Sequence, residues 1–199
     1  MHLDINEDID INEVIEFATT RHKGQVRYDG TEYIVHPMRV SQIVKKYKHS
    51  SNDKILEAGA ILHDVLEDTY TSYRELKDKF GEIVASLVME VTSSTFMPKL
   101  VGKQIYLAHK MQYMSSYALV IKLADRLDNI SDLSSVPLDK VKKTYFDTVY
   151  MINFIETKRI LTEPQKCLVA AIRQQLEVIN TEYNLSSNKL VVDTDIDQD

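Results

Sequence analysis

Apolar residues recur along this chain at the spacing of amphipathic helices. One stretch, residues 51–69, carries Ile, Leu, Ala and Val on one side of a predicted helix, and similar stripes follow in residues 83–91 and 162–179. Alternation of polar and apolar positions is not sustained anywhere, and the chain has only 5 Gly and 4 Pro, so no sheet is expected. The pattern predicts an all-α fold, a single bundle of roughly eight to ten helices.

Capping residues predict where several helices begin. The pairs are Asp10 with Glu13, Ser72 with Glu75, and Thr162 with Gln165. Loops are expected at residues 27–33, 92–99 and 136–137, and Gly81 is expected to end the helix that begins after Ser72. Residues 1–183 would form one domain, and residues 184–199, rich in Ser, Asn and Asp, a mobile acidic tail.

Composition narrows the class of protein. With 199 residues and 44% hydrophobic content, the chain can bury the core of one domain. A net charge of −6 argues against an extended nucleic-acid surface, and neither a signal peptide nor an apolar run long enough to span a membrane is visible. Cys167 is the only cysteine, so no disulfide can form within the chain, and this favours the cytoplasm. Its apolar neighbours predict that the thiol is buried. The sequence carries no signal for the oligomeric state.

Four residues of metal-ligand type lie in three segments: His36, His63, Asp64 and Asp125. Two imidazoles and two carboxylates suit one divalent ion and indicate metal-dependent phosphate chemistry. Burying them without a cation would be costly, although a structural ion-pair network involving Arg126 is the alternative.

Two further acids accompany these ligands. If residues 51–69 form one helix, Glu67 lies one turn beyond His63, and Asp68 lies one turn beyond Asp64. Asn129 has the same relation to Asp125. Carboxylates beside a metal could orient water and transfer protons, so this helix is expected to carry both ligands and acid–base groups.

The strings HKGQVRYDGTEYIVHPMRV, GAILHDVLEDT, FGEIVASLVMEVT and VIKLADRLDNI occur in this order between residues 22 and 130, within a resemblance to a known family that runs from about residue 14 to about residue 182. Together they resemble the HD-domain hydrolases of the RelA/SpoT group, most closely the stand-alone small alarmone hydrolases, which include the metazoan SpoT homolog. The resemblance implies removal of the 3′-pyrophosphate of (p)ppGpp, with one Mn²⁺ held by His36, His63, Asp64 and Asp125. It further implies that Glu67 and Asp68 are the catalytic pair.

The same resemblance suggests the substrate-binding residues: Arg27, Tyr28, Lys99, Lys103, Asn129 and Tyr145. Tyr28 stands where the family has a second basic residue, which favours purine stacking over guanine selection. Asp128 stands where His or Tyr is common and is expected to add negative charge near the metal. The alternatives are an HD phosphohydrolase acting on (p)ppApp or on the 2′-phosphate of NADPH, and a non-catalytic nucleotide sensor or interaction module.

Overall fold

The computed structural model describes residues 9–49 and 53–185. Ten helices are found there, and the only β-pairing in the described residues is an isolated bridge between Val26 and Glu32. The all-α prediction is confirmed. The helices are α1 Ile11–Arg21, α2 Val35–Tyr47, α3 Asp53–Ile61, α4 Val65–Asp68, α5 Tyr73–Val91, α6 Met97–Val101, α7 Lys103–Tyr113, α8 Ser116–Ser131, α9 Leu138–Lys158 and α10 Glu163–Tyr183.

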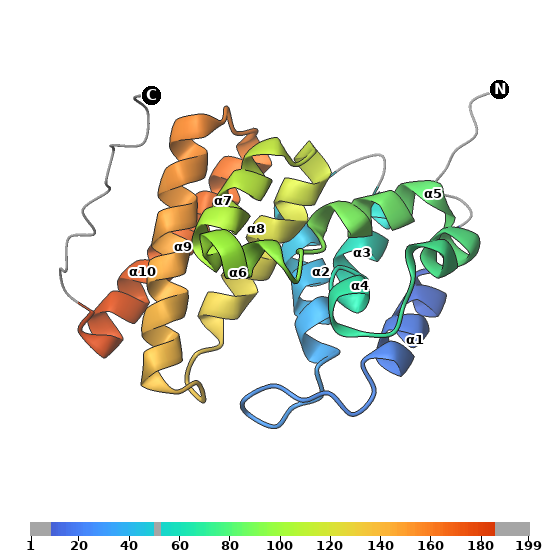
Figure 1. Cartoon of the computed structure of the whole chain (residues 1–199), viewed down its shortest axis with the longest axis horizontal. Coiled ribbons are helices and arrows are strands. Elements are labelled where there is room, and N and C mark those ends of the chain that lie inside the picture. The colour runs from blue at the N-terminus through green and yellow to red at the C-terminus, as the bar shows by residue number, and fades with distance from the viewer. Residues whose placement is uncertain (1–8, 50–52, 186–199) are drawn as a thin grey trace.

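Helix α8 lies in the middle of the bundle (Figure 1). It packs against α2 and α5 on one side and against α10 and α9 on the other. Its residues 118–125 are all buried, including Lys122 and Asp125. This stretch of about two turns is buried on every side, and the two charged residues within it therefore need buried partners.

Local sequence signals set several helix ends as expected. The Asp10 and Ser72 side chains cap α1 and α5, and Thr162 with Gln165 forms a complete capping box before α10. At Gly81 the backbone takes a φ of 85°, which kinks α5 between its two halves. A left-handed residue of this kind interrupts a helix at little cost only when it is glycine.

Close packing around α3 depends on Gly59. A Cβ atom placed there would lie 2.7 Å from the Leu87 side chain of α5 and 3.1 Å from that of Ile121 on α8. The helix just before His63 therefore approaches both neighbours more closely than an alanine would allow.

Two expectations about the end of the chain have different outcomes. Cys167 is exposed, so the prediction of a buried thiol is wrong. Neighbouring residues of a helix point about 100° apart. Leu168 points into the core, so Cys167 lies on the outer side of α10. Helix α10 ends at Tyr183 with Asn184 as its C-cap, and Leu185 is buried after it. The rest of the predicted acidic tail, residues 186–199, lies outside the described residues.

No helix among the described residues combines the length and the apolar character that crossing a membrane requires.

Candidate active site

The segment carrying His63 and Asp64 is a turn between two helices. Helix α3 ends at Ile61 and α4 begins at Val65, so the prediction of one helix over residues 51–69 is wrong at its centre. The imidazole Nδ1 of His63 donates to the Ala60 carbonyl at 2.8 Å. In a continuous helix that carbonyl would accept from the backbone N–H of Asp64. The histidine side chain thus takes the place of a helical hydrogen bond at the break.

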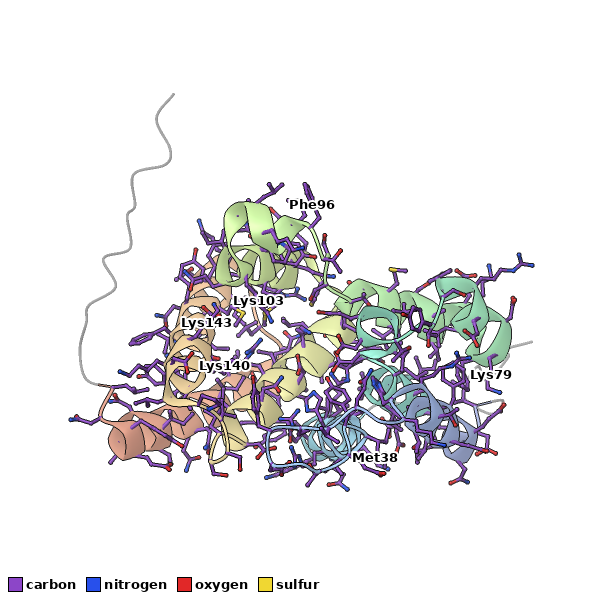
Figure 2. All side chains as sticks on the ribbon, turned by 60° about the horizontal axis from the view of Figure 1, so that its bottom comes forward. Met38, Lys79, Phe96, Lys103, Lys140 and Lys143 are labelled. Carbon is purple, nitrogen blue, oxygen red and sulfur yellow. The ribbon has the colours of Figure 1, made fainter. Side chains whose placement is uncertain are left out.

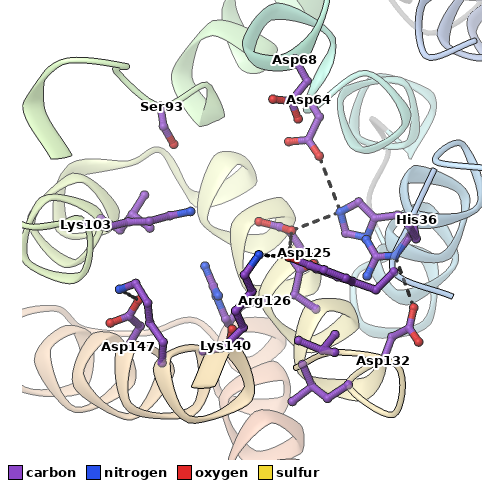
Figure 3. A pocket seen from close by; sticks show the side chains of 18 of the residues that line it. His36, Asp64, Asp68, Ser93, Lys103, Asp125, Arg126, Asp132, Lys140 and Asp147 are labelled. Atoms are coloured by element: carbon purple, nitrogen blue, oxygen red, sulfur yellow. Dashed lines mark hydrogen bonds and ion pairs between the residues drawn. The ribbon is translucent and has the colours of Figure 1, made fainter. Parts of the chain in front are cut away.

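This turn brings the four predicted metal ligands together. Ligand atoms of His36, His63 and Asp125 all lie within 4.8 Å of one another, and all three residues are buried. The Oδ2 atom of Asp64 lies 3.0 Å from Nε2 of His63 and 3.6 Å from Nε2 of His36. Helix α2, the turn after α3 and helix α8 therefore contribute side chains to one point (Figure 3).

The donor set fits a divalent cation. A carbonyl and a carboxylate can only accept, so His63 donates through Nδ1 to Ala60, and His36 donates through Nδ1 to Asp128 at 2.6 Å. Both Nε2 atoms face the carboxylates, and Nε2 of His63 is buried without a hydrogen-bond partner. Buried polar atoms are rarely left unpartnered, and a metal ion would satisfy this one.

Lys122 is a buried cation that the sequence reading did not identify. Its Nζ lies 3.0 Å from Oδ2 of Asp125, one helical turn away on α8. Although burial opposes its charge, the carboxylates of Asp125 and Asp64 raise the pKa of Lys122. The cation paired with Asp125 is therefore Lys122 and not Arg126, the partner considered from sequence. Both cations line the pocket. The i, i+3 spacing was the signal that could have found Lys122.

Glu67 and Asp68 lie on α4 at the edge of the same site. Asp68 is exposed overall, but partial burial of its carboxyl group, followed by the charges of Asp64 and Glu67, raises its pKa. The Tyr33 hydroxyl donates to Asp64 at 2.6 Å and lies 3.4 Å from Asp68. Burial and the Asp64 charge raise the pKa of Tyr33 well above its usual range, so the phenol stays protonated. Glu67 accepts from the backbone N–H of Ser93 at 2.9 Å.

A cavity of about 690 Å³ opens beside these groups. Asp64, Asp68 and Asp125 line it near the histidine His36, and Lys103 points in from the opposite side (Figure 3). Further cations line it, namely Arg27, Arg126, Lys140 and Lys143. Lys140 and Lys143 follow one another along α9, and Lys103 lies at the start of the neighbouring α7 (Figure 2). An acidic side faces a basic side, as a metal with a polyphosphate ligand would require.

The predicted substrate residues divide into two groups. Arg27, Tyr28, Lys103 and Asn129 line the cavity, whereas Lys99 and Tyr145 are not among its lining residues. Asn129 donates through its amide to Asp125, which adds a partner to a predicted ligand. Lys140 and Lys143 were missed, because their position depends on how α9 packs and no sequence motif marks them.

Asp128 was expected to add negative charge near the metal, and its carboxylate lies 2.6 Å from Nδ1 of His36. Arg39 donates to both of its carboxylate oxygens, at 2.7 Å and 3.1 Å. Arg39 also donates to Asp132, which pairs with Arg27 of the cavity wall. The carboxylate of Asp128 is thus balanced by an arginine.

The HD domain family profile matches residues 15–150, which span every ligand-type residue described above. This chain belongs to the HD-domain family.

Relatives of this HD-domain protein include the guanosine-3′,5′-bis(diphosphate) 3′-pyrophosphohydrolase MESH1 of Xenopus tropicalis. The two are 38% identical over 125 residues, 62% of this chain and 69% of that protein. The human MESH1 protein is 37% identical over 131 residues, covering 65% and 72%. A protein named guanosine-3′,5′-bis(diphosphate) 3′-pyrophosphohydrolase from Aquifex aeolicus is 35% identical over 149 residues, 70% of this chain but 20% of that longer protein.

A solved structure of a metazoan SpoT ortholog, described as hydrolysing ppGpp, superposes on this HD-domain protein with a TM-score of 0.69. The alignment covers 94% of this chain and 98% of that one at 24% identity. A Listeria monocytogenes protein gives a TM-score of 0.61 at 19% identity. These two likenesses support the fold.

Proposed function

We propose that this HD-domain protein is a metal-dependent hydrolase that removes the 3′-pyrophosphate of (p)ppGpp and yields GDP or GTP and pyrophosphate. The observation that carries the proposal is the convergence of His36, His63, Asp64 and Asp125 beside a cavity whose opposite wall is basic. Relatives 35–38% identical bear the name of this activity. Because the chain has one cysteine and forms no internal disulfide, we further propose a cytoplasmic enzyme.

The four ligands would hold one divalent ion, for which we propose Mn²⁺. A shell of two imidazoles and two carboxylates without a thiolate suits this ion. Such an ion would supply Lewis-acid activation of the attacked phosphoryl group and of the attacking water. Lys122 and Tyr33 would hold the carboxylates of Asp125 and Asp64 in place.

Asp68 and Glu67 are the proposed proton-transfer pair. Water attack on phosphorus breaks the bond to the ribose 3′-oxygen, so one proton leaves the water and one must reach that oxygen. A carboxyl group whose pKa is raised, as that of Asp68 is, transfers protons near neutral pH more readily than an ordinary one. Glu67 is held toward the site by the backbone of Ser93.

The basic wall is the proposed binding site for the substrate phosphates. Arg27, Lys103, Lys140 and Lys143 come from three separate segments and line one cavity. Tyr28 lies at its edge, 58% exposed, with Nζ of Lys140 placed 4.9 Å from its ring centroid. An exposed ring at this position offers a stacking face for a purine. Lys99, Asn129 and Tyr145 remain predicted substrate contacts.

The proposal is tested by assaying product release from ppGpp, ppApp and NADPH, each with Mn²⁺ and with EDTA. We expect ppGpp to yield GDP and pyrophosphate, the reaction to stop with EDTA, and Mn²⁺ to restore it. His63→Ala and Asp64→Ala should abolish both metal binding and hydrolysis, because each removes a ligand. The matched control is His109→Ala, since His109 is exposed and its ring contacts that of Phe154 at a tilt, outside the cavity.

Three results would contradict this proposal. If NADPH were the only one of the three nucleotides to be hydrolysed, the substrate would be NADPH and not (p)ppGpp. Binding of nucleotides without turnover at any metal concentration would indicate a sensor. Full activity of His63→Ala would refute the assignment of the site.

A further inference from the structure

The two histidines of the site are oriented by different groups. His63 donates through Nδ1 to a backbone carbonyl, a bond that no substitution of a partner side chain can remove. His36 donates through Nδ1 to the side chain of Asp128 at 2.6 Å, across 92 positions of sequence. His36 and Asp128 are 1% and 4% exposed. The orientation of His36 thus depends on one replaceable carboxylate.

The hydrogen bond to Asp128 determines which nitrogen of His36 faces the ligand cluster. With the Nδ1 proton donated to a carboxylate, Nε2 is the atom directed at Oδ1 of Asp125, 3.3 Å away, and at Oδ2 of Asp64, 3.6 Å away. Metal-bound histidines almost always show this arrangement, in which one nitrogen binds the ion and the other donates to an acceptor that fixes the ring.

Arg39 makes it possible to bury the Asp128 carboxylate. It sits one turn after His36 on α2, and donates from Nε to Oδ1 and from Nη2 to Oδ2 of Asp128. Such a two-point pair is the strong geometry for a guanidinium and a carboxylate. Because Arg39 balances the charge, Asp128 can serve His36 without remaining an unpaired buried anion.

We propose that Asp128, held by Arg39, is a positioning residue that orients the His36 ring so that Nε2 binds the metal ion. This inference rests on the proposed metal site. It assigns to Asp128 a role beyond the negative charge expected from sequence, because its carboxylate is shared between Arg39 and His36.

The test is Mn²⁺ affinity, measured on the full metal-free chain by electron paramagnetic resonance of free Mn²⁺. We expect Asp128→Asn to weaken binding by about 10–100-fold, the usual effect of losing an outer partner of a ligand, and Arg39→Gln to weaken it by roughly several-fold. The matched control is Glu57→Gln. Glu57 also pairs with a cation of α2, Lys45 at 3.1 Å, but lies outside the cavity lining.

Urea unfolding of each metal-free variant separates positioning from structure. A purely structural role would lower the free energy of unfolding while the folded protein kept its Mn²⁺ affinity. Affinity of Asp128→Asn within twofold of wild type would overturn the proposal. If Asp128→Asn does not fold, the test uses Arg39→Gln instead. A Mn²⁺ affinity of Arg39→Gln equal to that of the control Glu57→Gln then overturns the proposal.

Nitrogen NMR of the wild-type chain loaded with Zn²⁺ gives an independent readout. We expect a proton on Nδ1 of His36 and the metal on Nε2, and the reverse assignment would refute the inference. Wild-type protein that binds no divalent ion would overturn both this inference and the proposed function. Wild-type protein that binds the ion but does not hydrolyse ppGpp would overturn the proposed function alone.

Discussion

Replacing Tyr33 with phenylalanine tests how the carboxylates of the site are held. The hydroxyl of Tyr33 is the donor 2.6 Å from Asp64 and lies 3.4 Å from Asp68. Phenylalanine keeps the ring, which packs 4.8 Å from the His22 ring and 5.7 Å from that of His36. The substitution therefore removes one donor and little else.

The size of the effect follows from the burial of Asp64. A hydrogen bond to a charged group contributes about 1.5–3 kcal/mol to stability. Asp64 is 8% exposed but keeps His63 at 3.0 Å, so we expect the lower end, about 1.5 kcal/mol. For a chain of this length that loss lowers Tm by about 3–6 °C. Mn²⁺ affinity should fall by about 10-fold, because a ligand loses its outer partner.

Both quantities can be measured on one preparation, by urea unfolding without metal and by Mn²⁺ titration. Tyr73→Phe is the matched control, because the Tyr73 hydroxyl donates to Glu82 at an exposed position. Exposed pairs contribute little, so its stability should stay within about 0.5 kcal/mol of wild type. The reasoning is refuted if Tyr33→Phe behaves like Tyr73→Phe in both measurements.

Three further predictions concern the acidic pair, the metal and the nucleotide base. Combined Glu67→Gln and Asp68→Asn should suppress kcat strongly with bound metal unchanged, and loss of metal instead would show that these residues are ligands or supports. Burial lowers the pKa of His63, but the charges and hydrogen bonds of Asp64 and Asp125 together outweigh burial and raise the value to about 10. Because this proton must leave before metal binds, Mn²⁺ affinity should rise with pH from 6.5 toward about 10, and calorimetry showing a flat profile would contradict this. Finally, kcat/KM for ppGpp over ppApp should increase in Tyr28→Lys, whereas a strong guanine preference that the substitution leaves unchanged would exclude a role for Tyr28.

Periodicity predicted the helical class because a helix buries one face at a fixed spacing, whatever it packs against. The caps before α1, α5 and α10 were equally readable, since each uses side chains within three residues of the helix start. The break at His63 was not readable, because the apolar period continues through it. It depends on the imidazole bonding to Ala60 while its other nitrogen faces the site.

The identity of the candidate ligands was contained in the sequence, because few residue types bind metals and all four occur within family-like strings. Their partners were decided only by tertiary structure. Asp128 reaches His36 across 92 positions and Arg39 across 89, and the cations of α9 enter the cavity only because that helix packs beside α7 and α8. Hydrogen bonds and ion pairs between distant segments depend on distance and direction in three dimensions. The spacing of residues in the sequence does not give these distances and directions.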